Sequence, residues 1–549
     1  MKSMQKVKKM YNSYAIGLAV SLFSFIAGME LYSYLSIKNS EIFTTLYEKP
    51  TKFETNLLKS CNYLGAIAGS VIGGEIAEHF GFIKSMECLC IFWIIGIIFT
   101  FVSDTISMLI LGKIINGVAV GITFISIPIY QFEIIPIKRR GRVLSLFLFV
   151  SNLGNLISFL IPNMLIEQKN STYNAKYVRL YWLIELIPLI FAIVMLPFIP
   201  ESPKWLAVNS DWSTAADVLE SIEIKNSSTK DLKQQRKINL NRAKLGDKHF
   251  VTQNYSSTSD DLKSCSINRL FGKRYIRETS IAIIMKFLID FIAISNISES
   301  IDYISESCQI STLDDFKTVQ TAQLIARVVF STIPILISDV MRRKDILVYG
   351  TFLVTCIMFS YMVVFLGFSK PRSVASHSDW FLKVEFFGNS ASTVLALTGL
   401  LDVLYYTMII PISWLYTIES LTHSTRIRGW IVVTSLHWLF ESSISLTFPF
   451  LFQHLNGWIF FIISFICLIT LVFTTKLQET KGKILIESGY RNIGLNSSET
   501  ETTVSANNYK SALYDEKMSI NKINTPPLNP FQSKWELKQK LDKENDDYL

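Results

Sequence analysis

The sequence has 549 residues, of which 50% are hydrophobic and only 18% are charged, with a mean hydropathy of +0.33. A soluble chain of this length normally carries about a quarter charged residues, so the composition argues against a soluble enzyme and predicts an integral membrane protein. The net charge of +8 does not indicate nucleic-acid binding, because the Lys and Arg residues lie largely in the loops between apolar runs.

Twelve runs are long and apolar enough to span a bilayer, since about 20 apolar residues cross about 30 Å of hydrocarbon. They are 14–35, 61–79, 86–103, 107–131, 143–166, 180–199, 280–298, 321–338, 346–368, 393–418, 430–452 and 456–475. The seventh is the weakest, because it contains Lys286 and Asp290. The first lacks a small-residue cleavage site, so we expect no cleaved signal peptide. The predicted fold class is an all-α polytopic membrane protein, with twelve transmembrane helices in two six-helix bundles.

The placement of Lys and Arg predicts the orientation. Four lysines precede the first run, and basic clusters occupy 138–142 and 342–344, whereas the turns after the third and eleventh runs have no Lys or Arg. Both termini are therefore expected in the cytoplasm. We expect the protein in the plasma membrane, with the vacuolar or another internal membrane as the alternative.

Polar segments flank the bundles expected at 14–200 and 280–475. They are a cytoplasmic stub at 1–13, a middle loop at 201–279 and a tail at 476–549. In the middle loop, 207–222 has the spacing of an amphipathic helix, whereas 224–265 is predicted to be mostly disordered. The polar, proline-containing tail is also expected to be mostly disordered.

Three further sequence features concern covalent modification, metal binding and catalysis. None of the seven cysteines forms a C-x-x-C pair, so neither a metal site nor a disulfide framework is predicted. Asn170 begins an Asn-x-Thr sequence in the external loop after the fifth run, which makes it the candidate for glycosylation. No P-loop or nucleophile elbow occurs, so the sequence does not support an ATP-driven pump or a hydrolase, and no cofactor is expected.

Three strings occur at the ends of spans in both halves of the chain. The first runs from Glu78 to Lys84 and returns as Asp339 to Lys344; the second is Tyr-x-x-Glu followed by Arg-Gly, at 130–141 and again at 416–429. The third contains Glu201 after the sixth span and Glu479 after the twelfth. One half-chain design therefore occurs twice, as in many secondary transporters.

The charged residues of these strings predict a gate. Acids and bases at the cytoplasmic ends of spans can pair when the cavity faces outward and separate when it faces inward. The predicted gate comprises Glu78, Lys84, Glu133, Arg140, Glu201, Asp339, Arg343, Glu419 and Arg428. The alternative is that these are ordinary positive-inside loops with incidental acids.

The strings resemble those of the sugar porters of the major facilitator superfamily, in particular fungal hexose-transporter-like members. Residues 200–206 read PESPKWL against the family's PESPRWL, and 128–141 resembles the family's P-x-Y-x-x-E-x-x-P followed by R-G. The resemblance covers about 14–487. It implies a carrier without enzymatic activity, which moves a sugar or polyol by alternating access, as a uniporter or a proton symporter, and acts as a monomer in the bilayer.

The sequence departs from the family where sugar hydroxyls would be bound. At the family's seventh-span amide positions, this sequence has Ile289, Asp290 and Ser295. It has Leu148 in place of the family's fifth-span glutamine and Glu441 in place of the eleventh-span asparagine. Amides are lost and charges are gained. If this set defines specificity, common hexoses are expected to be poor substrates.

The cavity candidates combine these positions with nearby aromatic and polar residues. They are Trp414, Trp438, His437, Asp290, Lys286, Ser295, Glu441 and Asn155. The tryptophans could stack on sugar rings or serve only packing. Lys286 and Asp290, four residues apart, could neutralise each other or bind a charged or zwitterionic solute; His437 could bind substrate or titrate near neutral pH.

Glu30 in the first span and Lys113 in the fourth are the candidates for proton coupling. They occupy positions where the resemblance places an acid and a base in family symporters, and ionisable residues in a span commonly mark a pathway. The alternative is a purely structural ion pair. A second alternative concerns the whole protein, which could be a non-transporting nutrient receptor that signals through its polar segments.

Overall fold

A computed structural model of the protein describes residues 9–38, 43, 46–47, 50–166, 176–226, 232–255, 266–273, 275–292, 294–310, 313–371, 384–422, 424–455, 457–481, 483–486 and 489–492. The predicted glycosylation site at Asn170 and the tail beyond 492 lie outside these residues. By length and apolar composition alone, ten helices of the described part could cross a membrane.

The first half contains α1 (Ser13–Ile37), α3 (Lys52–Phe80), α4 (Phe82–Val102), α5 (Ile106–Ile134), η1 (Ile137–Arg139), α6 (Arg140–Ile166), α7 (Lys176–Ile184), α8 (Leu186–Met195) and η2 (Leu196–Phe198). Helices α9 (Pro203–Val208), α10 (Trp212–Asn226), α11 (Leu232–Tyr255) and α12 (Ile267–Leu270) connect the halves. The second half contains α13 (Ile276–Phe291), α14 (Ile294–Glu299), α15 (Ile301–Ser307), α16 (Leu313–Phe330), α17 (Thr332–Ile337), α18 (Arg343–Phe368), α19 (Asn389–Leu404), the π-helical turn η3 (Tyr405–Ile409), α20 (Ile410–Ser420), α21 (Arg426–Leu455) and α22 (Trp458–Lys476). Two short hairpins pair β1 (Lys370–Pro371) with β2 (Val384–Glu385) and β3 (Lys483–Ile486) with β4 (Gly489–Asn492).

Two predicted spans are absent from the ten apolar helices, for different reasons. The second span lies within α3, which is long but carries acids and lysines near both ends, including Glu54 and Glu78. The seventh is divided between α13 and α14, so neither piece alone is long enough. Both segments pack inside the bundle, where α3 lies against α5 and α13 against α20 and α21.

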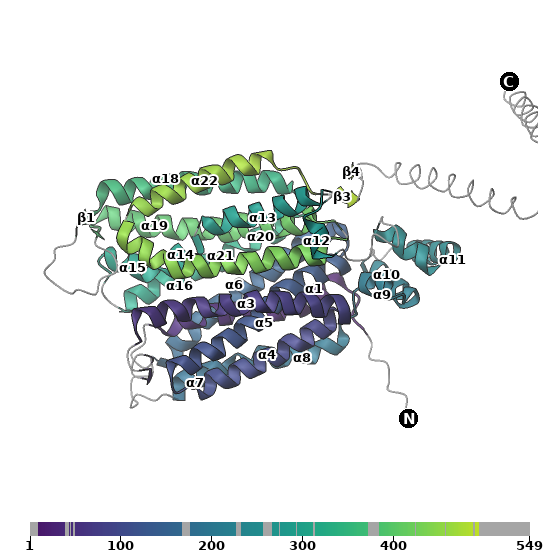
Figure 1. The fold of residues 1–549 in the computed structure, drawn as a ribbon, viewed down its shortest axis with the longest axis horizontal. Coiled ribbons are helices and arrows are strands. Elements are labelled where there is room, and N and C mark those ends of the chain that lie inside the picture. Colours follow the sequence, from purple (N-terminus) through teal and green to yellow (C-terminus); the bar gives the residue numbers. More distant parts are fainter. Residues whose placement is uncertain are drawn as a thin grey trace, which may run out of the picture. The chain divides into compact units, whose positions relative to one another are not determined.

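The two halves meet along several helix pairs. Helix α21 lies alongside α3 (Figure 1), and α6 packs against α16 and α17. Small residues allow such close approach. A Cβ on Gly74 of α3 would lie 2.3 Å from Cγ1 of Ile431 in α21, and one on Gly69 would lie 2.0 Å from the carbonyl oxygen of Val118 in α5. A single methyl group at either position would therefore collide with a neighbouring helix.

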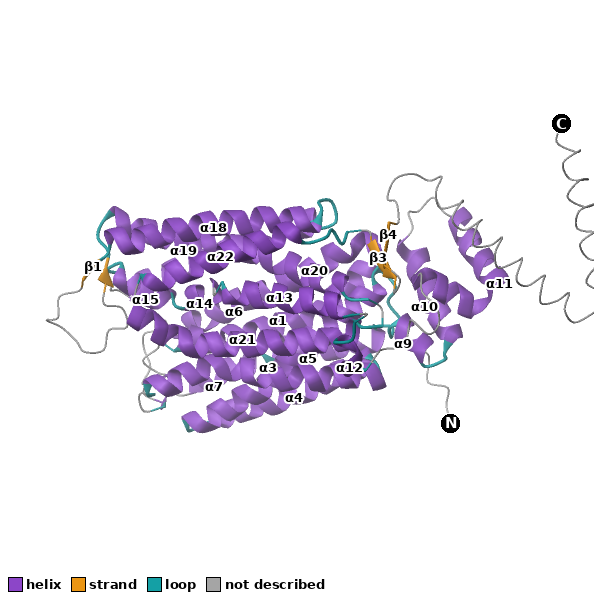
Figure 2. Ribbon diagram, turned by 45° about the horizontal axis from the view of Figure 1, so that its top comes forward, coloured by secondary structure: helices purple, strands orange, loops and turns teal. Residues whose placement is uncertain are grey.

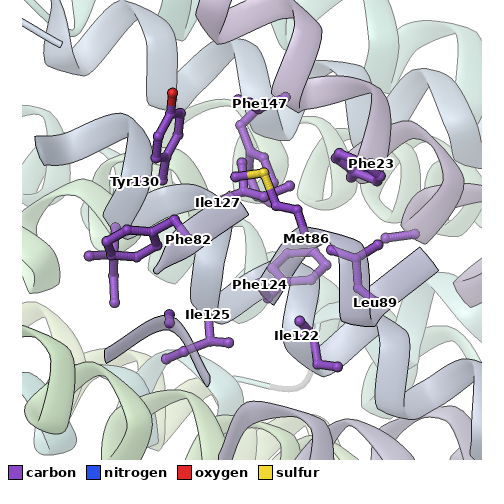
Figure 3. Close-up of a cluster of buried hydrophobic side chains, with 14 of the residues drawn as sticks. Phe23, Phe82, Met86, Leu89, Ile122, Phe124, Ile125, Ile127, Tyr130 and Phe147 are labelled. Atoms are coloured by element: carbon purple, nitrogen blue, oxygen red, sulfur yellow. The ribbon is translucent and has the colours of Figure 1, made fainter. Parts of the chain in front are cut away.

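The main apolar cluster begins within the first half and continues into the second. Figure 3 shows side chains of α1, α4, α5 and α6 gathered around Met86, Ile127 and Phe147. Phe124 of α5 extends this cluster across the boundary, because its ring centroid lies 5.3 Å from that of Trp414 and 5.2 Å from that of Trp438. Aromatic packing therefore joins the halves at the middle of the bundle.

The connecting segment forms a small helical layer. Figure 2 shows α9 to α11 at the end of the bundle opposite to β1, and we call these the α9 end and the β1 end. Ala215 and Ala216 of α10 are buried with Phe250 and Val251 of α11. Arg242 of α11 pairs with Asp217 at 2.7 Å and Glu220 at 2.6 Å on α10. Helix α10 overlaps the predicted helix at 207–222, whereas α11 occupies 232–255, where the polar composition predicted mostly disorder.

At the α9 end, the two halves repeat one set of hydrogen bonds. Glu201 accepts from the backbone N–H groups of Phe82 and Ile83, each at 3.1 Å, at the start of α4. Glu479 accepts from those of Arg343 and Lys344, at 3.0 and 3.1 Å, at the start of α18. A carboxylate at a helix N-terminus complements the helix dipole. Burial raises the pKa of Glu201, and the backbone donors lower it in part.

A second acid in each half completes the repeat. Glu133 accepts from the Ser202 hydroxyl at 2.6 Å and pairs with Lys204 at 3.2 Å. Correspondingly, Glu419 accepts from the Thr480 hydroxyl at 2.6 Å and pairs with Arg343 at 3.3 Å. The acids are equivalent, but the cations come from different segments of the chain.

Lys84 does not belong to this arrangement, contrary to the predicted gate. The backbone bonds show that Phe82 is the counterpart of Arg343, so the first half has an aromatic ring where the second has its cation. Lys84, two residues further on, is exposed and pairs with Glu87 at 2.7 Å. Lys204 instead supplies the positive charge to Glu133.

We predict that Lys204→Met lowers the free energy of unfolding by about 3–5 kcal/mol, because it removes the ammonium that lies 3.2 Å from the buried Glu133 carboxylate. Burial already lowers the pKa of Lys204, while Glu133 raises it. Lys84→Met is the matched control and should change stability little, since exposed ion pairs contribute little. Thermal unfolding of both purified variants in detergent measures the difference; equal midpoints would contradict the assigned pairing.

Candidate functional site

A cavity of about 120 Å³ lies between the two halves. By the same measure of volume, one water molecule needs about 10–15 Å³. Its walls come from α1, α3, α5 and α6 on one side and from α14, α16, η3, α20 and α21 on the other. Since both halves contribute, any movement of one half against the other would change the shape of the cavity.

Aromatic rings form much of the wall. They are Tyr32, Tyr63, Phe124, Tyr405, Tyr406, Trp414 and Trp438. Trp438 stacks on Tyr63 of the other half, with centroids 5.9 Å apart and planes inclined by 16°. The indole N–H of Trp438 is buried and has no hydrogen-bond partner among the described residues. The two predicted tryptophans thus line the cavity, and Trp438 keeps a buried donor for which the described residues offer no acceptor.

Four other predicted residues also line the cavity: Asn155, Ser295, His437 and Glu441. Ser295 donates to Glu441, with 3.3 Å to each carboxylate oxygen. Leu148, at the position of the family's fifth-span glutamine, is part of the same wall. Three of the substituted positions, Leu148, Ser295 and Glu441, therefore surround one space.

Asp290 and Lys286 do not line the cavity, contrary to expectation, and are not an ion pair with each other within 4 Å. Asp290 lies 2.9 Å from Nδ1 of His437, and Lys286 places its ammonium 4.0 Å from the centroid of the Trp414 ring. Because α13 packs against α20 and α21, both side chains stand behind cavity-lining residues. One ligand atom each of Asp290, His437 and Glu441 lies within 4.8 Å of the others, so a cation could be shared among them.

The cavity also contains an ion pair that the sequence did not predict. Arg327 of α16 bonds Asp402 of α19 through Nε at 2.8 Å and Nη2 at 2.5 Å, and Ser298 donates to the same carboxylate at 2.6 Å. The guanidinium lies 4.0 Å from the Tyr406 ring centroid. Both charges stand within apolar runs, which was the available signal, but the sequence does not show that their helices touch.

The predicted pair of Glu30 and Lys113 is present and fully buried. Lys113 Nζ lies 2.9 Å from Glu30 and 2.6 Å from the Ser33 hydroxyl, and Asn116 donates to Glu30 at 3.2 Å. A second acid, Glu185, lies beside both charges. The group therefore holds two carboxyls and one ammonium, next to the cavity-lining residues 31 and 32 of α1.

Two sets of polar contacts join the halves at the α9 end. Asp339 accepts from the backbone N–H groups of Gly141 and Arg142, at 2.9 and 3.1 Å. Arg428 pairs with Glu78 at 2.8 Å and also with Glu75, which the sequence analysis missed. Glu75 lies one helical turn before Glu78, and that spacing was the signal for it.

The other predicted gate residues make further contacts at the α9 end. Glu133, Glu201, Arg343 and Glu419 hold the repeated contacts described above. Arg140 donates to the carbonyl of Ile135 at 3.1 Å and places its guanidinium 4.2 Å from the Phe132 ring centroid. Two cross-half bonds also lie beside the cavity: Tyr63 donates to Glu299 at 2.8 Å, and Gln320 donates to the Tyr32 hydroxyl at 2.8 Å.

The sequence is similar to those of known transporters. It is 22% identical over 494 residues to a high-affinity glucose transporter of Kluyveromyces lactis, covering 88% of this chain and 85% of that protein. It is 23% identical over 492 residues to high-affinity glucose transporter 1 of Candida albicans, covering 88% and 87%.

The fold is that of the major facilitator superfamily. The proton:xylose symporter XylE, solved with 6-bromo-6-deoxy-D-glucose, matches with a TM-score of 0.67 at 18% identity, covering 86% of this chain and 98% of the symporter. The likeness confirms the predicted fold class of twelve transmembrane helices in two six-helix bundles. A family model described as sugar (and other) transporter matches residues 1–490, and because that match spans most of the 549 residues, the chain belongs to the sugar transporter family.

Proposed function

We propose that this protein transports a sugar or polyol across a membrane by alternating access. The observation that carries the proposal is a cavity shared by both halves, with aromatic faces, the free indole N–H of Trp438 and the polar side chains of Asn155 and Ser295. Aromatic faces suit sugar rings, and unpartnered buried donors suit hydroxyl oxygens. Each chain holds a complete cavity, so a monomer suffices.

The contacts at the α9 end support a gate. Asp339 holds the start of α6, and Arg428 holds the end of α3, each by contacts that cross between the halves. Rocking of one half against the other would break both sets at once and open the cavity to that end. The contacts that remain within a half, such as that between Glu133 and Lys204, would move with it as a rigid unit.

We propose that the α9 end faces the cytoplasm, because the basic clusters at 138–142 and 342–344 belong to this end of the bundle. Reporters of membrane sidedness fused after Lys9, within 230–260 and after Thr500 should therefore all report the cytoplasm. An external report from any one of them would contradict this orientation. The plasma membrane is the proposed location, which surface labelling of intact cells measures.

The proposed function is tested by uptake in a host that lacks its own sugar transporters. Cells that express the protein should take up at least one member of a panel of radiolabelled hexoses, pentoses, amino sugars and polyols, and unlabelled solute should compete. Surface-labelled protein is the control for delivery. No uptake of any member, with the protein at the surface, would overturn transport and favour the receptor alternative.

We propose that Glu30 binds the coupled proton. Glu30 and Glu185 share the single ammonium of Lys113 in a fully buried group, and one added proton would neutralise it. The structural likeness to a proton:xylose symporter supports this assignment.

Glu30→Gln should abolish accumulation against a gradient and preserve counterflow exchange, because Glu185 remains beside Lys113 and only the proton step is lost. Accumulation and counterflow of the solute identified by the panel measure both properties. Glu87→Gln, at an exposed carboxylate, is the matched control and should retain accumulation. If the wild-type protein never accumulates solute and an uncoupler has no effect on uptake, the protein is a facilitator, and Glu30 is a structural partner of Lys113.

A further inference from the structure

The charges around the cavity do not balance. Arg327 is already neutralised by Asp402, in a two-point ion pair that Ser298 completes. Arg327 lines the cavity, but its pair with Asp402 has no net charge. The remaining ionisable side chains of the second half therefore decide what charge the cavity presents to a solute.

Those remaining groups include three acids, Asp290, Glu299 and Glu441. The cation among them is the ammonium of Lys286, which lies over the Trp414 ring, while His437 contacts Asp290 at 2.9 Å. Lys38 and Lys59 act on Glu299 from the β1 end. Lys286 stands behind Trp414, where its single ammonium acts on both Asp290 and Glu441, and Glu441 faces the cavity.

Glu441 lines the cavity and shares the one ammonium of Lys286 with Asp290. Among the described residues its hydrogen bonds come from a single hydroxyl, that of Ser295, at 3.3 Å to each oxygen. It is 6% exposed and lines the cavity. A carboxylate in this position is stabilised by a cation that enters from the cavity, since an isolated buried charge is costly.

The surrounding rings suit the same kind of ligand. Tyr63, Tyr405 and Trp438 line the cavity together with Glu441. Aromatic faces attract ammonium groups, and more strongly where water is excluded. Two cations of the protein already use rings of this wall: Lys286 lies 4.0 Å from the Trp414 centroid, and Arg327 lies 4.0 Å from that of Tyr406.

We propose that the transported solute is a sugar or polyol with a protonated amino group, whose ammonium binds Glu441. The inference rests on the proposed transport function and specifies its substrate class. The aromatic faces and Asn155 would bind the hydroxyl-bearing ring, and Glu441 would select the charge. A neutral hexose would bring no cation to this carboxylate, which predicts weak binding of common hexoses.

The test compares three solutes in the uptake host: glucosamine, glucose and N-acetylglucosamine. Glucose replaces the ammonium with a hydroxyl of similar size, and N-acetylglucosamine keeps the nitrogen but removes its charge. Glucosamine should be taken up with a KM at least about tenfold lower than either neutral sugar. Unlabelled glucosamine should also inhibit the uptake of labelled glucosamine at a correspondingly lower concentration than either neutral sugar does.

Glu441→Gln keeps the side-chain shape but removes the charge, so it should raise the KM for glucosamine about tenfold and abolish the preference over glucose. Glu87→Gln should keep the wild-type preference. If Glu441→Gln fails to reach the surface, Ser295→Ala provides the second measurement, because it removes the hydroxyl that donates to the carboxylate and should weaken the same preference.

The outcomes separate the two proposals. If glucose or N-acetylglucosamine is transported as well as glucosamine, or if Glu441→Gln keeps the preference for glucosamine, the amino-solute inference is overturned and sugar transport stands. If surface-expressed protein transports none of the panel solutes, the proposed function itself fails.

Discussion

The cost of a charge without a partner in an apolar interior constrains much of this structure. Glu30 and Lys113 fix α1 to α5, Arg327 and Asp402 fix α16 to α19, and Asp290 and His437 fix α13 to α21. Each pair joins helices that are distant in sequence. Removing one partner of such a pair is strongly destabilising, so these charges determine which helices can be neighbours as much as the apolar residues do.

The duplicated ends show which part of the design must be kept. Both halves retain an acid that accepts from the first N–H groups of a helix, Glu201 on α4 and Glu479 on α18. The residue that supplies the cation differs between the halves. Arg343 pairs with Glu419, whereas Lys204 pairs with Glu133, because Phe82 occupies the position that is equivalent to Arg343. Backbone donors cannot be mutated away, which explains why the helix-end contact is constant and the side-chain pair is not.

Much of the fold was predictable, because length and hydropathy identify spans and the repeated strings identify two halves. The pairing of Glu30 with Lys113 and the place of Trp438 in the cavity were also foreseen, the former through family resemblance. What failed was the choice of partner. Spacing alone paired Lys286 with Asp290, but tertiary packing gave each a nearer contact on α20 or α21. The order of α11 was missed because Arg242 draws its partners from α10 as well as α11, which composition cannot show.

The same reasoning connects the cavity to the movement of the halves. Glu299 accepts from Tyr63, a bond that crosses between the halves beside the cavity, and Tyr63 also stacks on Trp438. A solute that binds among these residues competes with contacts that hold the halves together. A ligand shifts a conformational equilibrium only by its difference in affinity for the two states. An ammonium near Glu441 and Glu299 would supply such a difference, because it would replace the cross-half hydrogen bond from Tyr63 to Glu299 with an ion pair that moves with the second half.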